Sequence, residues 1–259
     1  MLKAKHGFSF VVAAVSVLLL VACSDGVTPL SSDSETSVST GTMTDSRDGQ
    51  TYKTITIGTQ TWMAQNLNYA YTDVPYKRGD YTSDSTSWCH NDSASYCTKY
   101  GRLYTWAAAM DSTGTWSSNG VGCGYGNRCS PTYPVRGVCP EGWHLPTRVE
   151  FETLFTAVGG QSTAGKVLKS TSGWTTSGWN SGGNGSDAFA FSALPAGGGY
   201  SNGGYDYEGD CAFFWSSTEY GSYYAYVMYL YYDYDDASLD DNYKGNGFSV
   251  RCLKDAETE

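Results

Sequence analysis

The eight cysteines are the residues whose types and spacing predict the most definite chemistry in this 259-residue sequence. In an oxidising compartment most of them should pair, and cysteines close together in the chain are the first candidates. The long-range pair is then Cys139, just ahead of the second predicted helix, with Cys252 in the last predicted strand, which leaves Cys211 as a free thiol. Zinc binding is the competing interpretation, but the spacings are too wide for zinc-knuckle loops, so no metal site is expected. The expected disulfides join Cys89 to Cys97, Cys123 to Cys129, and Cys139 to Cys252.

Tyrosines and aspartates concentrate between Tyr200 and Tyr243, a stretch that holds more than half of the 22 tyrosines. Aromatic faces stack on the apolar side of a pyranose ring, while carboxylates and amides accept its hydroxyl protons. This composition therefore favours sugar binding by exposed loops. The candidate ligand-binding tyrosines of the loops are Tyr200, Tyr205, Tyr207 and Tyr220.

The segment from Tyr224 to Tyr232 is the exception within this stretch. Both of its alternating faces are apolar, which is the pattern of a central strand buried on both sides. Its tyrosines are therefore interpreted as core residues and not as ligand contacts.

Two further candidate ligand-binding residues, Trp174 and Trp179, each follow a Thr-Ser-Gly tripeptide in a glycine- and serine-rich stretch. Leaving an indole exposed without a partner forgoes the free energy of its burial. Either the two side chains clamp a ligand or they fold back over the core, and both alternatives stay open at the level of sequence.

The acidic run from Asp233 to Asn242 could ligate Ca²⁺ through its carboxylate oxygens. It is not an EF-hand loop, because Ala237 stands where an oxygen ligand belongs and the required glycine is missing. A lectin-type calcium signature is also missing, since the corresponding strand reads Trp215-Ser-Ser217. A solvated hairpin turn is the preferred interpretation, with Ca²⁺ as the alternative and no other cofactor expected.

Residues suited to catalysis are few. His144 lies in a Trp-His-Leu-Pro segment just before an expected helix, where a packed and hydrogen-bonded histidine is the ordinary explanation. The zinc-protease motif His-Glu-x-x-His is absent from the sequence. We therefore expect no enzymatic activity.

Charge excludes nucleic acid as a partner. The chain has 16 Lys and Arg residues but 26 Asp and Glu residues, and the resulting formal charge of -10 repels phosphates. Aromatic residues make up 15% of the chain and charged residues only 16%, which is the composition of a chain with a folded core.

The N-terminus predicts export. Two lysines precede an apolar run that is too short to span a bilayer and fits a signal peptide over residues 1–22. The run ends in Leu-Val-Ala-Cys, which resembles a bacterial lipobox, so Cys23 is the expected lipidation site and the membrane the expected attachment. Residues 23–44 are rich in Ser and Thr and predict a flexible tether, followed by a single globular domain over residues 45–259.

The elements expected in this domain give an α+β fold with antiparallel sheets, two main helices and long Gly-rich loops. A hairpin is predicted from Tyr52 to Met63 with its turn at Gly58. Helices are predicted over residues 99–110 and 147–158, the second from a Thr147-x-x-Glu150 capping box. A short helical turn is predicted over residues 164–168, and strands over residues 189–194, 212–217, 223–232 and 247–253.

Seven short segments carry a family resemblance, and the most specific reads Cys139-Pro-Glu-Gly-Trp-His-Leu-Pro146. Together they resemble the Fibrobacter succinogenes major paralogous domain (FISUMP) family. The resemblance implies an envelope lipoprotein of bacteria that degrade plant fibre, one of many paralogues and without an established activity. The closing strands also resemble the C-type-lectin-like and sulfatase-modifying-factor architecture, although fold does not fix function. The seven segments are residues 48–52, 57–67, 100–104, 137–147, 193–197, 214–218 and 248–252.

The lipobox, the tether and the aromatic–acidic loops together predict a non-catalytic recognition or adhesion module. It is expected to be exported, lipid-anchored to the cell envelope and placed on the outer membrane facing the surface. Plant cell-wall polysaccharide is the expected ligand. The alternative is a structural envelope protein with protein partners, and the third hypothesis is an enzyme that acts on glycans or through a cysteine.

Overall fold

The computed structural model describes residues 38–72, 76–78, 81–83, 86–176 and 183–257, and Thr36–Glu259 form one compact unit. The predicted signal peptide, the lipidation site Cys23, the first part of the tether and Trp179 lie outside the described residues. Among the described helices, none has the length and apolar composition that crossing a membrane requires. The fold is α+β with antiparallel sheets, as the sequence predicts.

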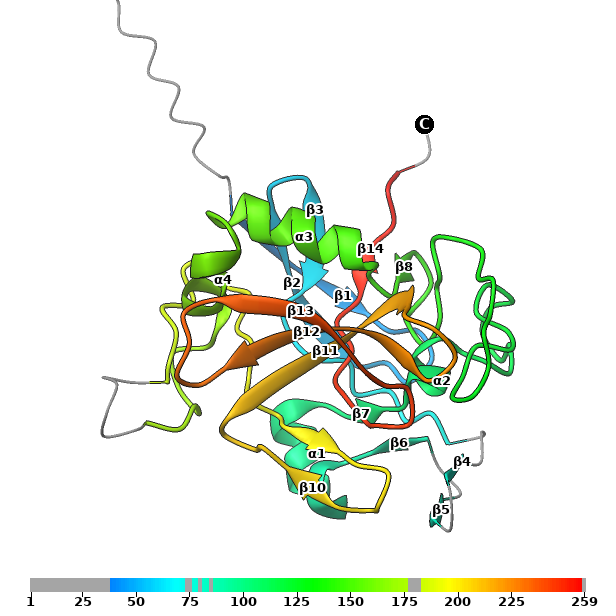
Figure 1. Ribbon diagram of the computed structural model, residues 1–259. Helices are drawn as coiled ribbons and strands as arrows, with labels where there is room; N and C mark the ends of the chain where they lie inside the picture. The colour runs from blue at the N-terminus through cyan, green and yellow to red at the C-terminus, as the bar shows by residue number, and fades with distance from the viewer. Residues whose placement is uncertain (1–37, 73–75, 79–80, 84–85, 177–182, 258–259) are drawn as a thin grey trace, which may run out of the picture. The chain divides into compact units, whose positions relative to one another are not determined.

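A five-stranded antiparallel sheet forms one part of the domain (Figure 1). Its centre is the predicted hairpin, in which Ile55 pairs with Trp62 and Gly58 turns the chain with φ of 60°. Strands from the end and the middle of the sequence complete the sheet. The order is β1 (Ser39–Thr44), β2 (Thr51–Ile57), β3 (Gln60–Met63), β14 (Leu253–Lys254) and β8 (Trp143–His144).

Strand β1 shows that the prediction of a tether extending to residue 44 is wrong for its last six residues. Ser39–Thr44 pair along the whole length of β2, from Ser39 opposite Thr56 to Thr44 opposite Thr51. The strand is almost entirely exposed, so its sequence lacks the apolar alternation that identifies a half-buried strand. Backbone pairing with β2 holds it in place, and threonine suits such a pleated position.

A separate three-stranded antiparallel sheet contains β11 (Cys211–Glu219), β12 (Tyr224–Tyr231) and β13 (Ala237–Tyr243). The predicted central strand is β12, which pairs with both neighbours. Val227 belongs to one buried apolar cluster, whereas Met228 and Leu230 belong to another. The sheet therefore separates two cores, which explains why β12 reads as apolar on both faces.

Helices α3 (Arg148–Ala157) and α4 (Gln161–Leu168) pack against this three-stranded sheet (Figure 1). The predicted capping box is present, since the Thr147 hydroxyl accepts from the Glu150 N–H while the Glu150 carboxylate accepts from the Thr147 N–H. Phe151 and Leu154 then face the core. The short helical turn predicted over residues 164–168 is the second half of α4.

The prediction of one helix over residues 99–110 is wrong. The chain forms α1 (Ala94–Tyr100), then β7 (Leu103–Tyr104) paired with β6 (Ser87–Trp88), then the single turn α2 (Trp106–Ala109). Gly101 ends α1 with φ of 74°, and a Cβ there would lie 2.8 Å from the Leu67 carbonyl oxygen. The helical spacing of apolar residues across Gly101 was therefore coincidental. The remaining elements are η1 (His90–Asp92), β4 (Tyr76–Arg78) with β5 (Tyr81–Ser83), and β9 (Gly198–Gly199) with β10 (Tyr205–Asp206).

Two of the predicted strands are also wrong in extent. Residues 189–194 form turns and one isolated bridge between Ala193 and Lys169, because Ala190 and Ser192 adopt φ values of 53° and 52°. Residues 247–253 make only isolated bridges, for example between Phe248 and Tyr104, until β14 begins at Leu253. Residues 247–253 are buried throughout and residues 189–194 are partly buried, with Phe191 and Ala193 in the core, yet neither segment is a regular strand.

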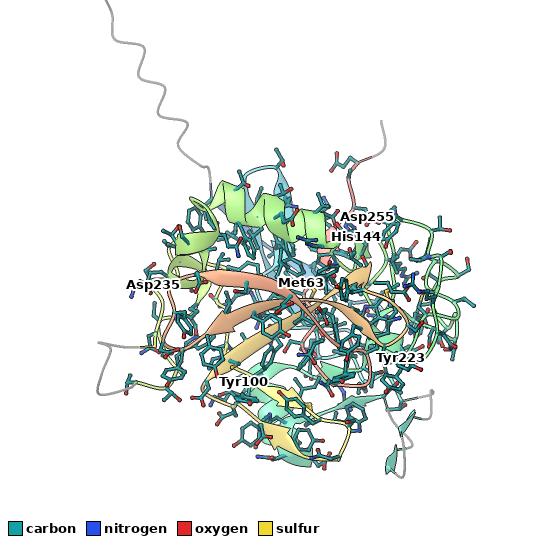
Figure 2. All side chains as sticks on the ribbon, in the orientation of Figure 1. Met63, Tyr100, His144, Tyr223, Asp235 and Asp255 are labelled. Carbon is teal, nitrogen blue, oxygen red and sulfur yellow. A yellow bond between two sulfur atoms is a disulfide. The ribbon has the colours of Figure 1, made fainter. Side chains whose placement is uncertain are left out.

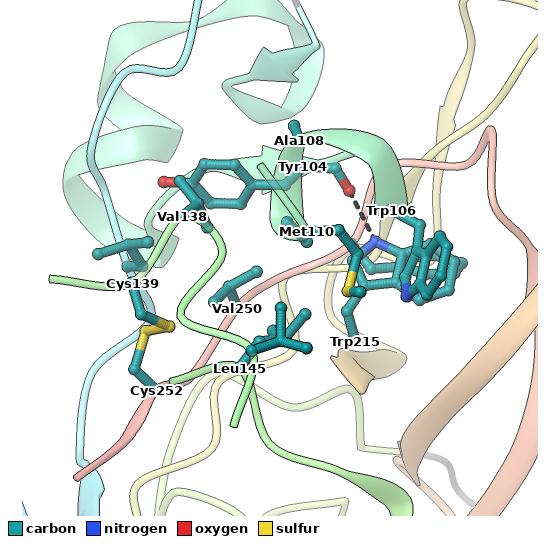
Figure 3. Packing of buried hydrophobic residues seen from close by; sticks show 14 of the residues in the cluster. Tyr104, Trp106, Ala108, Met110, Val138, Cys139, Leu145, Trp215, Val250 and Cys252 are labelled. Atoms are coloured by element: carbon teal, nitrogen blue, oxygen red, sulfur yellow. Dashed lines mark hydrogen bonds between the residues drawn. A yellow bond between two sulfur atoms is a disulfide. The ribbon is translucent and has the colours of Figure 1, made fainter. Parts of the chain in front are cut away.

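The core beside the five-stranded sheet is aromatic and is closed by a long-range disulfide (Figure 3). The Trp215 indole N–H donates to the Tyr104 carbonyl oxygen at 2.7 Å, so a fully buried tryptophan keeps its hydrogen bond. Cys139 and Cys252 are bonded in the same cluster, which ties the final strand to the segment before α3.

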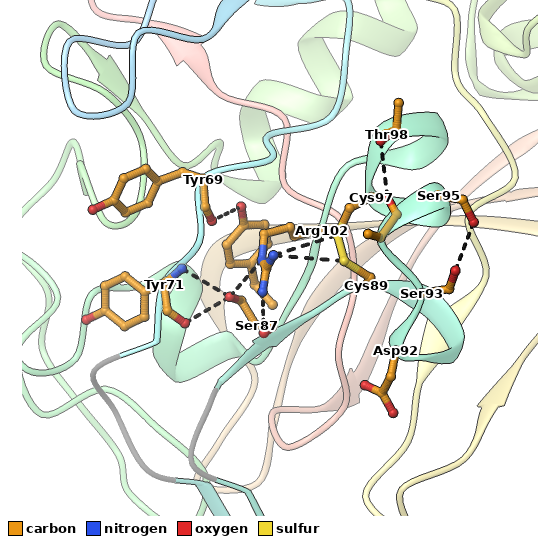
Figure 4. Close-up of a disulfide and its surroundings, with 12 residues drawn as sticks. Tyr69, Tyr71, Ser87, Cys89, Asp92, Ser93, Ser95, Cys97, Thr98 and Arg102 are labelled. Carbon is orange, nitrogen blue, oxygen red and sulfur yellow. Dashed lines mark hydrogen bonds between the residues drawn. A yellow bond between two sulfur atoms is a disulfide. The ribbon is translucent and has the colours of Figure 1, made fainter.

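The other two predicted disulfides are confirmed as well, and each closes a local loop. Figure 4 shows the bond between Cys89 and Cys97, with the Arg102 guanidinium Nη1 lying 3.9 and 3.8 Å from the two sulfur atoms. Arg102 Nη2 also donates to the Ser87 carbonyl oxygen at 3.1 Å, so the loop is fixed to β6. Cys211 is a buried free thiol, as predicted.

Candidate functional site

A surface hollow of about 400 Å³ lies at one end of the three-stranded sheet. We call it the tyrosine hollow. Two of its residues come from β12, two from the following turn and two from β13. Tyr229 lies directly opposite Ser238 in the antiparallel register, so both side chains project from the same face. The lining residues are Tyr229, Tyr231, Tyr234, Asp236, Ser238 and Asp240.

Tyr229 is the fixed base of the tyrosine hollow. Its hydroxyl accepts a hydrogen bond from Asn242 Nδ2 at 2.7 Å and lies 3.3 Å from the Asp241 carbonyl oxygen. Its ring packs edge-on against Phe213 at a centroid distance of 5.1 Å. Tyr229 therefore belongs partly to the core and partly to the surface.

The other two rings are open to solvent. Tyr231 is 36% exposed and Tyr234 is 59% exposed, and their centroids lie 5.8 Å apart. Burial raises the pKa of Tyr229 and of Tyr231 to about 12, so both hydroxyls are neutral at physiological pH, and that of Tyr229 already donates to the Asp241 carbonyl oxygen. Together with the carboxylates of Asp236 and Asp240, the hollow offers aromatic faces, hydroxyl donors and carboxylate acceptors.

Helix α4 holds the turn that carries Tyr234 and Asp236. The Lys169 ammonium, just beyond the helix, donates to the carbonyl oxygens of Tyr231 at 2.9 Å and Tyr234 at 2.9 Å. Burial lowers the pKa of Lys169, although the nearby Asp235 charge opposes the shift. Gly165 allows the close approach, because a Cβ there would lie 2.1 Å from the Asp236 carbonyl oxygen. The turn is thus attached to the scaffold through its backbone.

The loop tyrosines chosen from the sequence are distributed over several places. Tyr207 is exposed beside the same sheet face, with its ring 6.3 Å from Phe213, which also contacts Tyr229. Tyr200 packs against Tyr207 and is half-buried. Tyr205 is half-buried too, and its hydroxyl donates to Asp92 at 2.7 Å. The structure therefore brings Tyr200 and Tyr207 near the tyrosine hollow, but neither lines it.

Tyr220 lies in the turn between β11 and β12 and is exposed. Its ring packs edge-on against Tyr226 at 5.4 Å. Because Tyr231 stands at the opposite end of β12, Tyr220 is not part of the tyrosine hollow.

The placement of Trp174 corrects its interpretation as a ligand contact. The side chain is only 4% exposed and belongs to a core cluster. Its indole N–H donates to the Ser170 hydroxyl at 3.0 Å and to the Ala193 carbonyl oxygen at 3.1 Å. Of the two alternatives open at the sequence level, Trp174 therefore folds back over the core.

The tyrosines of the hollow itself were missed by the sequence interpretation, because β12 was interpreted as core throughout. Its odd-numbered positions start in the core at Ala225 and Val227 and end exposed at Tyr231. The neighbouring strand carried a partial signal, because Ser238, directly opposite Tyr229, is polar on the same face. Asp240 is polar as well but lies opposite the buried Val227, so the polarity of β13 alone does not locate the end of the core.

The acidic run divides into a turn and a strand, with residues 233–236 before β13 and residues 237–242 within it. The predicted hairpin turn is confirmed for the first part. Successive strand residues alternate in direction, so Asp240 and Asp241 point to opposite faces. No group of three or more His, Cys, Asp or Glu side chains that could hold a metal ion occurs among the residues that the structure describes.

His144 is packed and hydrogen-bonded, as predicted, and lies beside Asp255 (Figure 2). Its Nδ1 is 2.6 Å from an Asp255 oxygen and its Nε2 is 3.0 Å from a Glu150 oxygen. Both ring nitrogens are therefore occupied. The segment Gly199–Gly203 spells Gly-x-Ser-x-Gly, but it enters the turn between β9 and β10 and is no strand-to-helix elbow.

The His144 cluster predicts a pH-dependent contribution to stability. Burial alone lowers the pKa of His144, but Glu150 and Asp255 outweigh it and raise the pKa above its ordinary value of 6.5. Burial opposes the shift of Glu150 as well, yet His144 and Thr147 lower its pKa below the ordinary value of 4.5. The Glu150 contribution is complete above pH 4.5, and the His144 contribution is complete below pH 6.5 and is lost at higher pH.

We expect His144→Gln to destabilise the protein more at pH 5.5 than at pH 9. Urea unfolding of the wild type and the variant at both pH values measures this difference directly. The matched control is Tyr223→Phe, a surface change that should give the same small effect at both pH values. An equal loss of stability for His144→Gln at the two pH values would contradict the proposed charge state.

The fold and its surface define the class of protein as an α+β domain with three disulfides and a tyrosine-lined hollow. Residues 55–254 match the Fibrobacter succinogenes major domain, and the chain belongs to this family. No curated protein and no solved structure matches the chain significantly. Membership of this paralogous family is compatible with a surface protein, and the resemblance to C-type-lectin-like architecture stays a prediction.

Proposed function

We propose that this protein is a non-catalytic recognition module, anchored by lipid to the cell envelope and facing the surface, that binds plant cell-wall polysaccharide. The tyrosine hollow carries the proposal. Exposed rings at Tyr231 and Tyr234 offer faces for the apolar side of a pyranose, and Asp236 and Asp240 offer acceptors for its hydroxyl protons.

The proposed location rests on the N-terminal sequence and on the cysteines. An apolar run followed by Cys23 fits lipoprotein processing, and the Ser/Thr-rich residues after it would separate the domain from the membrane. Three disulfides in one domain suit an exported protein, because cytosolic reductants keep thiols reduced.

Retention on insoluble polysaccharide tests the proposal. Soluble protein from Thr36 to Glu259, which keeps β1 intact, is mixed with cellulose, xylan and pectin, with and without Ca²⁺. We expect retention on at least one of them. The double variant Tyr231→Ala/Tyr234→Ala should bind roughly fivefold more weakly or worse, because each lost ring contact is worth about 0.5–1.5 kcal/mol.

The matched control is Tyr220→Ala/Tyr223→Ala, which removes two similarly exposed tyrosines outside the tyrosine hollow. This control should bind like the wild type. If no polysaccharide retains the wild-type protein, the sugar-binding proposal fails and the structural envelope role with protein partners takes its place. If both double variants lose binding equally, the tyrosine hollow is not the site.

A further inference from the structure

A second pocket, of about 230 Å³, lies among β2, the segment after β3 and the end of α1. We call it the basic pocket. Segments far apart in the sequence meet here, and five of the seven segments that carry the family resemblance contribute to its lining. It shares no lining residue with the tyrosine hollow. The residues used below are Tyr52, Lys53, Asn66, Asn68, Lys99 and Arg251.

The charge of the basic pocket is opposite to that of the protein. The chain has ten more acidic than basic residues, yet Lys53, Lys99 and Arg251 line this pocket and none of its described lining residues is acidic. The tyrosine hollow is the reverse, since it contains two aspartates and no cation. Such a local excess of positive charge attracts anions.

Arg251 is a buried cation that forms no ion pair with a residue that the structure describes, although the charge of Asp187 acts on it. Its side chain is 1% exposed, and its Nε donates to Asn66 Oδ1 at 2.8 Å while Nη2 donates to the Ser192 carbonyl oxygen at 2.8 Å. Nη1 donates to the Phe191 carbonyl oxygen. All three acceptors are neutral, and burial lowers the pKa of Arg251 to about 9 although the Asp187 charge opposes the shift. An anion in the adjacent pocket would add negative charge close to the guanidinium.

The two lysines of the basic pocket differ in whether their charge already forms an ion pair. Lys99 Nζ lies 3.3 Å from Glu208, so its charge is already paired. Lys53 is exposed on β2 and forms no ion pair with any residue that the structure describes. Lys53 can therefore contact an anion directly at the pocket mouth.

The neutral polar groups of the basic pocket call for a ligand that also carries hydroxyls. Asn68 Oδ1 is buried and accepts no hydrogen bond from the residues that the structure describes. The Tyr52 hydroxyl accepts from the Asn68 N–H at 3.0 Å, which leaves its own hydrogen to be donated. A buried acceptor without a partner costs free energy that a ligand hydroxyl would recover.

We propose that the basic pocket binds a small sugar acid of the hexuronate class, with its carboxylate beside Lys53 and Arg251 and a ring hydroxyl donating to Asn68. The small volume suits one ring rather than a chain segment. The source is either a free monosaccharide or the end of an acidic polysaccharide. The proposal does not depend on the tyrosine hollow.

Calorimetric titration of the protein from Thr36 to Glu259, which contains every described element and all three disulfides, tests the proposal. The probes are D-galacturonate, D-glucuronate, D-galactose, a galacturonate trimer and inorganic sulfate. At least one uronate should bind at least tenfold more tightly than galactose and than sulfate. If the trimer binds as tightly as D-galacturonate, the end of an acidic polysaccharide can be the source of the ligand. If the trimer does not bind, the source is the free monosaccharide.

Two substitutions test separately the contact of the ligand carboxylate with Lys53 and the contact of the ligand hydroxyl with Asn68. Lys53→Gln should weaken uronate binding about tenfold, and Asn68→Ala should weaken it about threefold to tenfold, with unchanged unfolding midpoints. The matched control Lys166→Gln removes an exposed lysine of α4 outside the basic pocket and should leave binding unchanged. Three results would overturn the proposal: galactose or sulfate binding as tightly as both uronates, Lys53→Gln behaving like Lys166→Gln, or no uronate binding.

Discussion

Replacing both Cys139 and Cys252 by alanine is expected to lower the free energy of unfolding by about 4.7 kcal/mol, because the bond closes a loop of roughly 100 residues. The two cysteines are 113 positions apart and fully buried in the core that contains Trp215. Without the bond, the unfolded chain regains the freedom of that whole loop. For a domain of this size the loss corresponds to a melting temperature lower by roughly 10–20 °C.

The matched control removes a local disulfide, with Cys89→Ala/Cys97→Ala. This bond spans a separation of only eight residues, so its loss should cost roughly 2.5 kcal/mol by the same loop-closure argument. Thermal unfolding followed by circular dichroism compares the two double variants. A local variant as unstable as the long-range variant would contradict the assignment of the main covalent constraint to Cys139 and Cys252.

The second large effect is expected at Arg251. In Arg251→Met the side-chain volume is nearly kept, but Asn66 Oδ1 and the carbonyl oxygens of Phe191 and Ser192 lose their donor. At about 1 kcal/mol for each unpaired buried acceptor, the variant should lose about 3 kcal/mol of unfolding free energy. Urea unfolding measures the loss.

Arg251→Lys is the informative companion variant. Lysine keeps the positive charge but cannot reach three acceptors at once, since its single ammonium group lacks the planar fork of a guanidinium. It should therefore recover part of the stability lost in Arg251→Met. A methionine variant as stable as the wild type would show that the guanidinium network contributes nothing net.

Local signals in the sequence were reliable where one short segment determines its own structure. Gly58 with its flanking alternation predicted the first hairpin, and Thr147 with Glu150 predicted the start of α3. The three disulfides followed from spacing and compartment. For the hairpin, the start of α3 and the two local disulfides, the physical cause is contained within a few residues. The long-range disulfide was assigned from the cysteines that remained after the local pairs.

Predictions failed where distant segments decide the structure. Gly101 interrupts the helical pattern because the backbone of Leu67 passes close to it, and nothing in the local sequence indicates that contact. Ser39–Thr44 form a strand because β2 offers an unpaired edge. Trp174 is buried because Ser170 and Ala193 satisfy its indole N–H, which no spacing rule reveals.

In the candidate site, too, the sequence indicated the region but not the positions that contacts between distant segments decide. Composition directed attention to the tyrosines and aspartates after Tyr200, and the tyrosine hollow lies within that stretch. The individual residues were not predicted, because exposure along β12 depends on where the core beneath it ends. Tyr231 lies beyond that end, whereas Val227 on the same face is fully buried.

Hydrogen–deuterium exchange of the protein bound to its polysaccharide tests the central claim most directly. Strand β13 is an edge of its sheet, so half of its amides are open to solvent and should exchange quickly in the free protein. We expect bound polysaccharide to slow exchange over residues 229–240 and to leave the turn at Tyr220 unchanged. Slowed exchange elsewhere, with residues 229–240 unaffected, would contradict the assignment of recognition to the tyrosine hollow.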